Sequence, residues 1–274
     1  MSIKTYLGDC LEVMRSIPDQ SIDMILCDLP YGVLNKGNES AQWDSVIPFE
    51  PLWEQYRRIC KETTPIVLFG QGMFSAEVML SNKPMWRYNL IWQKDRPTGF
   101  LNANRMPLRS HEDIMVFYDR LPIYNPQMKA CKPWERCHAI GNGEHTDRNQ
   151  QYGDFNRLHQ PIIRDEKFPK SVIFVPQEHK CDGKSHPTQK PVELCEYLIK
   201  TYTDPGMTVL DNCMGSGTTG IAAIQCGRNF IGIEKDENYY NLAVERIEKA
   251  EYKVKTRTTL DSFLVGCNPE QRAI

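Results

Sequence analysis

Short apolar runs alternate with longer segments of helical spacing along most of the 274-residue chain. Strands are expected at Ile3–Leu7, Ile22–Cys27, Pro65–Phe69, Tyr88–Trp92, Ile114–Tyr118, Thr208–Leu210 and Phe230–Ile233. Apolar runs of this length are typical of strands in a parallel sheet that helices cover on both faces. The alternation therefore predicts an α/β fold around a seven-stranded, mostly parallel sheet with helices on both faces.

The middle of the chain interrupts this alternation. Helices are expected at Cys10–Ile17, Phe49–Cys60, Val192–Tyr202, Thr218–Cys226 and Asn238–Ala250. Between the second and third of these helices, the region from Arg120 to Lys184 is polar, irregular and rich in turns, with one strand expected at Ser171–Val175. We therefore predict a discontinuous main domain (residues 1–119 and 185–255), an insertion (residues 120–184) and a polar C-terminal tail (residues 256–274).

Composition and charge exclude several classes of protein. Hydrophobic residues make up 41% of the chain and the net charge is -2, which is ordinary for a soluble globular protein. No apolar run is long enough to cross a membrane and the first residues lack a signal peptide, so we expect a cytoplasmic protein. The ten cysteines follow no metal-ligand spacing, and we expect no metal site. The region from Arg120 to Lys190 has a net charge of +4, a mild indication that it contacts phosphates.

A glycine loop joins a predicted strand to a predicted helix. Gly215, Gly217 and Gly220 fit the pattern GxGxxG, and Glu234 lies 19 residues after Gly215. A carboxylate at this distance accepts hydrogen bonds from ribose hydroxyls, and the glycines bring backbone N–H groups close to a ligand. No GKS or GKT follows, so a nucleoside-triphosphate loop is not expected.

This loop leaves two ligands open, a nicotinamide dinucleotide and S-adenosylmethionine. Asp211 lies at the lip of the loop. A carboxylate there opposes a pyrophosphate but can hold an ammonium group, which favours S-adenosylmethionine.

Several segments resemble motifs of the DNA amino-methyltransferases. Asp28-Leu29-Pro30-Tyr31 resembles their DPPY motif, and Asp211–Thr218 resembles their cofactor loop DPFxGSGT. The segments His186–Pro191, Gly8-Asp9 and Arg109–Glu112 also resemble the family. The DPPY-like corner precedes the cofactor loop, an order that resembles the beta class, and the resemblance covers about residues 3–250.

The resemblance implies a Rossmann-like methyltransferase fold and S-adenosyl-L-methionine as cofactor. It implies methyl transfer to the N6 amino group of adenine in a base flipped out of double-stranded DNA. An exocyclic amine is a poor nucleophile until its N–H groups find acceptors, and the Asp28 carboxylate can accept one hydrogen bond. The Leu29 or Pro30 carbonyl can accept the other, and the resemblance favours Pro30. Tyr31 would stack on the base.

The acceptor base follows from the first residue of the motif. In this family Asp at that position favours adenine, whereas Ser favours cytosine N4, so Asp28 favours adenine. A cytosine-N4 enzyme is the alternative, and a methyltransferase that acts on RNA or on a protein amide is also left open. A C5-methyltransferase is disfavoured because the chain has no Pro-Cys pair for its nucleophile.

The resemblance also implies the remaining contacts. It assigns cofactor binding to Asp9, Asp211, Gly215, Ser216, Gly217, Thr218, Glu234, Thr188 and Lys190. The insertion occupies the place of a target-recognition region, with Arg136, Arg148, Asn149, Gln150, Gln151 and Arg157 as candidate contacts to phosphates and base edges. The expected partner is double-stranded DNA, and no membrane association is expected. The resemblance implies a role in DNA methylation and restriction–modification. A homodimer is left open.

Two hypotheses from other functional classes stay open from the sequence. A nicotinamide-dependent oxidoreductase would use the glycine loop but leave Asp28 and Tyr31 unexplained. An inactive DNA-binding relative would bind DNA without transferring a methyl group, and the intact Asp28 and glycine loop count against it.

Overall fold

The computed structural model describes residues 1–33, 44–131, 165–178 and 189–266, the last ten by their backbone. The chain forms two compact units: Met1–Asn125 together with Ser171–Ile274, and Pro126–Lys170. The first unit contains an eight-stranded sheet and the second contains the two-stranded pair β6 (Lys129–Ala130) and β7 (Glu166–Lys167).

The large sheet has the strand order β1-β10-β9-β2-β3-β5-β4-β8. Its strands are β1 (Ile3–Leu7), β2 (Met24–Cys27), β3 (Ile66–Gly70), β4 (Trp86–Thr98), β5 (Arg109–Phe117), β8 (Val172–Phe174), β9 (Thr208–Asp211) and β10 (Asn229–Glu234). All neighbours are parallel except that β5 runs antiparallel to both β3 and β4. The predicted α/β class with a mostly parallel sheet is confirmed.

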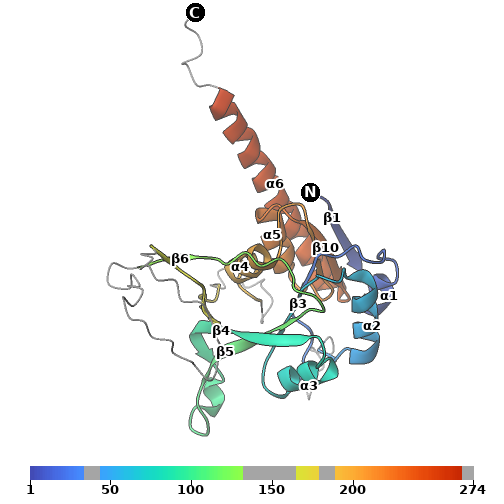
Figure 1. Cartoon of the computed structure of the whole chain (residues 1–274), viewed down its shortest axis with the longest axis vertical. Helices are drawn as coiled ribbons and strands as arrows, with labels where there is room; N and C mark the ends of the chain where they lie inside the picture. The colour runs from blue at the N-terminus through green and yellow to red at the C-terminus, as the bar shows by residue number, and fades with distance from the viewer. Residues whose placement is uncertain (34–43, 132–164, 179–188, 267–274) are drawn as a thin grey trace, which may run out of the picture. The chain divides into compact units, whose positions relative to one another are not determined.

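Helices cover both faces of this sheet (Figure 1). They are α1 (Cys10–Met14), α2 (Phe49–Ile59), α3 (Met73–Ser81), α4 (Val192–Tyr202), α5 (Thr218–Gln225) and α6 (Glu237–Gly266). Because successive strand residues point to opposite faces, Met24 and Leu26 of β2 join one core and Ile25 and Cys27 join the other. The first core packs against α4, α5 and α6, and the second against α1, α2 and α3.

The chain leaves the centre of the sheet in opposite directions. From β9 it passes through α5 to β10 on one side, and from β2 it passes through α2 to β3 on the other. Helices diverge at such a switch point, and ligands bind in the crevice beyond the carboxyl ends of the strands there. The fold therefore places the ends of β2 and β9 where a binding site is expected.

Several elements differ from their predicted limits. The segment expected as a strand within the insertion forms β8, which pairs with β4 as the eighth strand of the sheet. The helix α3 was not predicted, because its sequence is apolar on nearly every side and lacks helical periodicity. The helix α6 continues to Gly266, well past the expected end at Ala250.

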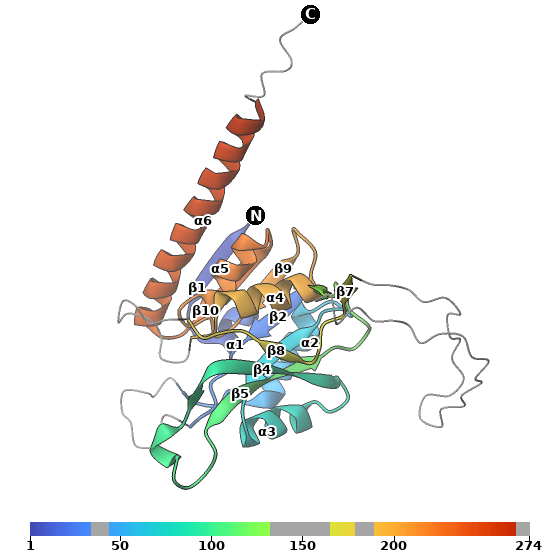
Figure 2. The same cartoon turned by 90° about the vertical axis from the view of Figure 1, so that its left-hand side faces the viewer.

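The hairpin of β4 and β5 is also longer than expected, and Figure 2 shows the two strands running together to a tip that carries the short helix η2 (Phe100–Asn102). Among the described residues, no helix combines the length and apolar character that crossing a membrane requires.

Candidate active site

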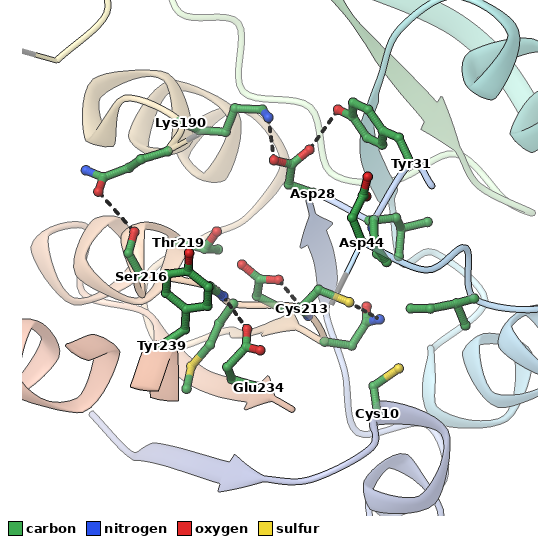
Figure 3. A pocket seen from close by; sticks show the side chains of 18 of the residues that line it. Cys10, Asp28, Tyr31, Asp44, Lys190, Cys213, Ser216, Thr219, Glu234 and Tyr239 are labelled. Carbon is green, nitrogen blue, oxygen red and sulfur yellow. Dashed lines mark hydrogen bonds and ion pairs between the residues drawn. The ribbon is translucent and has the colours of Figure 1, made fainter. Parts of the chain in front are cut away.

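One cavity of about 900 Å³ opens at the carboxyl ends of β1, β2, β9 and β10 (Figure 3). Most of the residues predicted for the site line it: Asp9, Asp28, Pro30, Tyr31, Lys190, Asp211, Gly215, Ser216, Thr218 and Glu234. Gly217 is not among the lining residues, and Thr188 lies outside the described residues. The sheet thus brings together the corner at Asp28 and the glycine loop that begins at Asp211, although the two are far apart in the sequence.

The corner after β2 holds its carboxylate between two donors. The Tyr31 hydroxyl donates to Asp28 Oδ1 over 2.8 Å, and Lys190 Nζ donates to Asp28 Oδ2. The Tyr31 ring stacks on Phe74 of α3 with centroids 4.6 Å apart. The buried Asp44 accepts hydrogen bonds from the next two backbone N–H groups, those of Gly32 and Val33, and so fixes the path of the corner.

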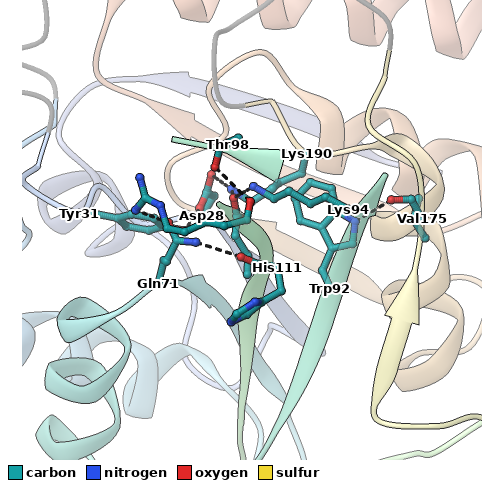
Figure 4. Close-up of polar contacts among 11 residues, drawn as sticks. Asp28, Tyr31, Gln71, Trp92, Lys94, Thr98, His111, Val175 and Lys190 are labelled. Carbon is teal, nitrogen blue, oxygen red and sulfur yellow. Dashed lines mark hydrogen bonds and ion pairs between the residues drawn. The ribbon is translucent and has the colours of Figure 1, made fainter. Parts of the chain in front are cut away.

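Lys190 connects this corner to the β4–β5 hairpin through a chain of buried charges (Figure 4). Its Nζ lies 3.2 Å from Glu112 Oε2, and Glu112 Oε1 accepts a hydrogen bond from Lys94 at 2.5 Å. The side chains of Lys94, Glu112 and Lys190 are 6%, 13% and 7% exposed. Buried charges persist when they are paired, and here two ammonium groups alternate with two carboxylates, of which Asp28 is the more exposed at 28%.

Burial and the partner charges set the ionisation of this chain. Burial raises the pKa of Asp28 and the Glu112 carboxylate raises it further, while the Lys190 ammonium opposes both. Burial also disfavours the charged form of Glu112, but the Lys190 and Lys94 ammonium groups outweigh it and lower its pKa. Burial would lower the pKa of Lys190, yet Asp28 and Glu112 together raise it. Asp28 is therefore a carboxylate whose charge depends on Lys190.

The cofactor loop begins with a buried acid. Asp211 is 4% exposed and accepts a hydrogen bond from the backbone N–H of Cys213 at 3.1 Å. Burial raises the pKa of the Asp211 carboxyl to about 7, against hydrogen bonds from Thr219 and Cys213 that favour the charged form. A ligand cation at this position would compensate the buried charge.

Glu234 closes the other side of the loop. Its Oε2 accepts from the N–H of Gly215 at 2.8 Å, and its Oε1 accepts from those of Lys235 and Asp236 at 2.8 and 2.9 Å. A carboxylate has about four lone-pair positions, so one stays available for a hydroxyl of a ligand. Burial still raises the pKa of Glu234, with these backbone hydrogen bonds opposing the rise.

The loop leaves space where a ligand would lie. Gly215 has a positive φ of 51°, and a Cβ added there meets nothing within 4 Å. Gly217, with a φ of 78°, lies against Ala243 and Ile247 of α6, so its role is close packing of the loop on that helix. The buried Oγ1 of Thr218, at the start of α5, has no hydrogen-bond partner within the part of the chain that the structure describes. An orphaned hydroxyl on the wall of a cavity is a further sign of a binding position.

Asp9 and Ser216 have structural partners as well. Asp9 caps α1 by accepting from the N–H of Leu11 at 3.0 Å, with Lys235 Nζ at 3.3 Å. The Ser216 hydroxyl donates to the side chain of Gln189 at 3.0 Å, and Arg246 of α6 donates to the Ser216 carbonyl. Both predicted residues lie on the cavity wall while stabilising their own loops.

Sequence reasoning missed Lys94, Glu112 and Asp44 as members of the site. Trp92 and Lys94 are both buried and two residues apart, which places them on one face of β4. The sequence signal for Lys94 was its position two residues after the large apolar Trp92, on the same face of the strand. The pairing of Glu112 opposite Trp92 depends on the register of the β4–β5 hairpin.

A family model of DNA methylases, the N6/N4 methyltransferases, matches residues 22–245 of this chain. The chain belongs to this family. It is a DNA amino-methyltransferase of the N6/N4 type, in agreement with the resemblance seen in its motifs. The match spans both the Asp28 corner and the glycine loop, which are the two halves of the cavity.

A curated relative and several solved structures resemble this chain, and DNA methyltransferases are among them. The Type II methyltransferase M.HinfI of Haemophilus influenzae is 28% identical over 276 residues, covering 88% of this chain and 67% of that protein. The crystal structure of the M1.HpyAVI-SAM complex has a TM-score of 0.59 at 22% identity, over 89% of this chain and 98% of that one. The cytosine-N4-specific PvuII DNA methyltransferase has a TM-score of 0.64 at 16% identity, over 93% of both chains. These structural likenesses establish the methyltransferase fold of this amino-methyltransferase.

Proposed function

We propose that this DNA methyltransferase transfers a methyl group from S-adenosyl-L-methionine to the N6 amino group of adenine in double-stranded DNA. One observation carries the proposal: the Asp28 corner and the glycine loop between Asp211 and Thr218 line the same cavity at the switch point of the sheet. The Asp28 corner, which would hold the acceptor amine, and the glycine loop, which would bind the sulfonium cofactor, therefore share one cavity.

The residues of the loop fit the cofactor. The Asp211 carboxylate suits the ammonium group of the cofactor, and the remaining lone-pair position of Glu234 suits a ribose hydroxyl. The Thr218 hydroxyl, which has no hydrogen-bond partner among the described residues, offers a further hydrogen bond. Gly215 leaves room for the ligand to approach the backbone. S-adenosylmethionine supplies an electrophilic methyl group when bound.

The corner after β2 would hold the acceptor amine. The lone pair of an exocyclic amine is delocalised into the ring, and hydrogen bonds from its two N–H groups to Asp28 and the Pro30 carbonyl favour a tetrahedral nitrogen. The chain forms no covalent bond to the base in this account, so catalysis consists of positioning and electrostatic stabilisation. Tyr31, partly buried and stacked on Phe74, offers the aromatic surface on which a flipped base would stack.

In this proposal Lys190 supports the corner at Asp28 rather than binding the cofactor. Its ammonium group lies on Asp28 and opposes the rise in pKa that burial causes. When the methylated nitrogen loses its proton, a partly buried carboxylate with a raised pKa is suited to accept it. Glu112 and Lys94 position Lys190 through the chain of charges.

The target-recognition role belongs to the insertion in this proposal. The sequence of this region is the more basic part of the chain, which suits contact with DNA phosphates. The candidate contacts Arg136, Arg148, Asn149, Gln150, Gln151 and Arg157 lie outside the described residues.

The test is to identify the product. The purified protein is incubated with S-adenosylmethionine and unmethylated duplex DNA of mixed sequence, and the DNA is digested to nucleosides for mass spectrometry. We expect N6-methyldeoxyadenosine. N4-methyldeoxycytidine would instead make this a cytosine-N4 enzyme and contradict the choice of base drawn from Asp28.

A further inference from the structure

The tip of the β4–β5 hairpin exposes a cluster of large apolar side chains. Phe100 and Leu101 of η2 are 76% and 84% exposed, and Met106 and Leu108 on the return of the chain are 56% and 40% exposed. Single exposed apolar residues are common, but a contiguous group of them marks a surface that contacts a partner. These four side chains take no part in the cores of the sheet.

The tip, residues 99–108, has a defined backbone. The N–H of Asn102 donates to the Gly99 carbonyl at 2.9 Å, and that of Ala103 donates to the Phe100 carbonyl at 3.1 Å. The N–H of Met106 donates back to the Asn102 carbonyl at 3.0 Å. Gly99 begins the turn with a φ of 90°, which favours glycine. Phe100 and Leu101 are therefore presented by an ordered turn.

The tip starts at the mouth of the active-site cavity. Thr98 and Arg109 form the last pair of the hairpin, and both line the cavity that contains Asp28. Arg109 is held there by a 2.9 Å hydrogen bond from its guanidinium to Gln71, another lining residue. The apolar cluster follows directly after the cavity wall in the chain.

The charge of this hairpin end matches a nucleic-acid backbone. Residues 95–109 contain Arg96, Arg105 and Arg109 against Asp95 as their one acid. Arginines beside an exposed apolar cluster suit a partner that has both phosphates and stacked rings.

We propose that the tip is a wedge that enters the base stack of duplex DNA, with Phe100 and Leu101 filling the gap that the target base leaves. This inference rests on the proposed function, because it assigns the tip to the same flipped-base complex. Extruding a base costs unstacking free energy, and apolar side chains inserted between base steps replace part of the lost stacking. The arginines would contact the phosphates on either side of the gap.

The test compares a short duplex of mixed sequence with the same duplex carrying one central abasic nucleotide. In the abasic duplex the gap exists before binding, so the wild-type protein should bind it about tenfold more tightly, as expected for one stacking interaction. The variant F100A/L101A should lose this preference and should methylate intact plasmid DNA about tenfold more slowly. Both substituted residues are exposed, so the variant should unfold at the wild-type temperature.

Two further variants define the outcome. L80A/L121A removes two leucines that are 74% and 78% exposed elsewhere, and it should behave as the wild type. F100W keeps an aromatic wedge and should keep the preference for the abasic duplex. A wild type without the preference, or F100A/L101A with wild-type preference and methylation rate, would overturn the wedge. Preference for the abasic duplex without any methyl transfer by the wild type would instead overturn the proposed function and leave the wedge supported.

Discussion

At the scale of single residues, the corner after β2 combines an acceptor carboxylate with the cation that keeps it charged. Burial favours the neutral form of Asp28, which would accept fewer hydrogen bonds from an amine. Lys190, itself buried and held by Glu112, offsets this effect. The reactivity of the corner therefore depends on a residue 162 positions away in the chain.

Replacing Lys190 should change the pH dependence of methyl transfer. Asp28 must be ionised, so activity is lost as the pH falls through its pKa. Lys190 lowers that pKa, and Lys190→Met should therefore move the acidic limb of the kcat/KM profile to higher pH. Lys190→Arg, which keeps the charge, should move it less. An acidic limb at the same pH in the wild type and Lys190→Met would contradict this role.

Asp211 should make the free protein less stable as the pH rises toward neutrality. Its folded-state pKa of about 7 lies above the usual carboxyl value, so between the two the folded state holds a proton that the unfolded state releases. Stability falls over this window and the deficit is complete above about pH 7. Asp211→Asn should therefore raise the unfolding temperature more at pH about 8 than at mildly acidic pH. An equal rise in unfolding temperature of Asp211→Asn at both pH values would contradict the raised pKa of Asp211.

The sequence indicated the acids at the strand ends but not the charges around them. Asp28, Asp211 and Glu234 could be predicted because each directly follows or ends a short apolar run. Glu112 could not, because its burial follows from the pairing of β4 with β5 and from its contact with the segment before α4. Lys190 was predicted as a site residue, yet its partner in the structure is Asp28.

At the scale of elements, the cofactor loop is fixed by close packing of α5 on β10 and α6. A Cβ added at Gly220 would lie 2.7 Å from the Phe230 ring and 2.8 Å from Ile247 Cδ1. Alanine in a helix is favoured over glycine by about 1 kcal/mol, but overpacking a core typically costs about 1–3 kcal/mol. The packing cost should prevail because both neighbours are buried.

Gly220→Ala should accordingly destabilise the protein by about 1 kcal/mol and weaken binding of S-adenosylmethionine. Gln225→Ala, at an exposed position near the end of the same helix, is the matched control and should have little effect. Denaturant unfolding and calorimetric titration measure the two quantities. A stabilised Gly220→Ala would show that α5 can shift away from β10.

Elements whose sequences are short apolar runs or amphipathic helical patterns could be predicted, and elements without either pattern could not. The strands β2 and β9 and the helix α4 lie where their apolar patterns indicated. Residues 73–81 are apolar on most sides, so α3 gave no amphipathic signal. The outer part of the β4–β5 hairpin is polar and mostly exposed, so only its buried inner part was visible as strand.

At the scale of the whole molecule, two of the three tasks of a DNA methyltransferase, holding the amine and binding the cofactor, are assigned to the ends of different strands of one sheet. The proposed amine-holding residues follow β2, and the proposed cofactor residues follow β9 and β10. Recognition of the DNA sequence is assigned in our proposal to the insertion. The three tasks should therefore respond separately to substitution.

Neutralising the insertion should weaken DNA binding while leaving the cofactor site intact. Each lost phosphate contact lowers the slope of log affinity against log salt by about 1. R148Q/R157Q should lower it by up to about 2 and bind S-adenosylmethionine normally. K249Q/K253Q, on the outer part of α6, is the charge-matched control. An unchanged salt slope in R148Q/R157Q would show that these arginines do not contact phosphates.

The most direct test of the account is the effect of Asp28→Asn on turnover and on cofactor binding, measured in the same preparation. Asn keeps the size of the side chain but presents one acceptor oxygen without charge. Methyl transfer to duplex DNA should fall at least about a hundredfold, as for loss of one transition-state hydrogen-bond partner. The Kd for S-adenosylmethionine should stay within about twofold of the wild type. Near-normal turnover in Asp28→Asn would contradict the assignment of this carboxylate to the acceptor amine.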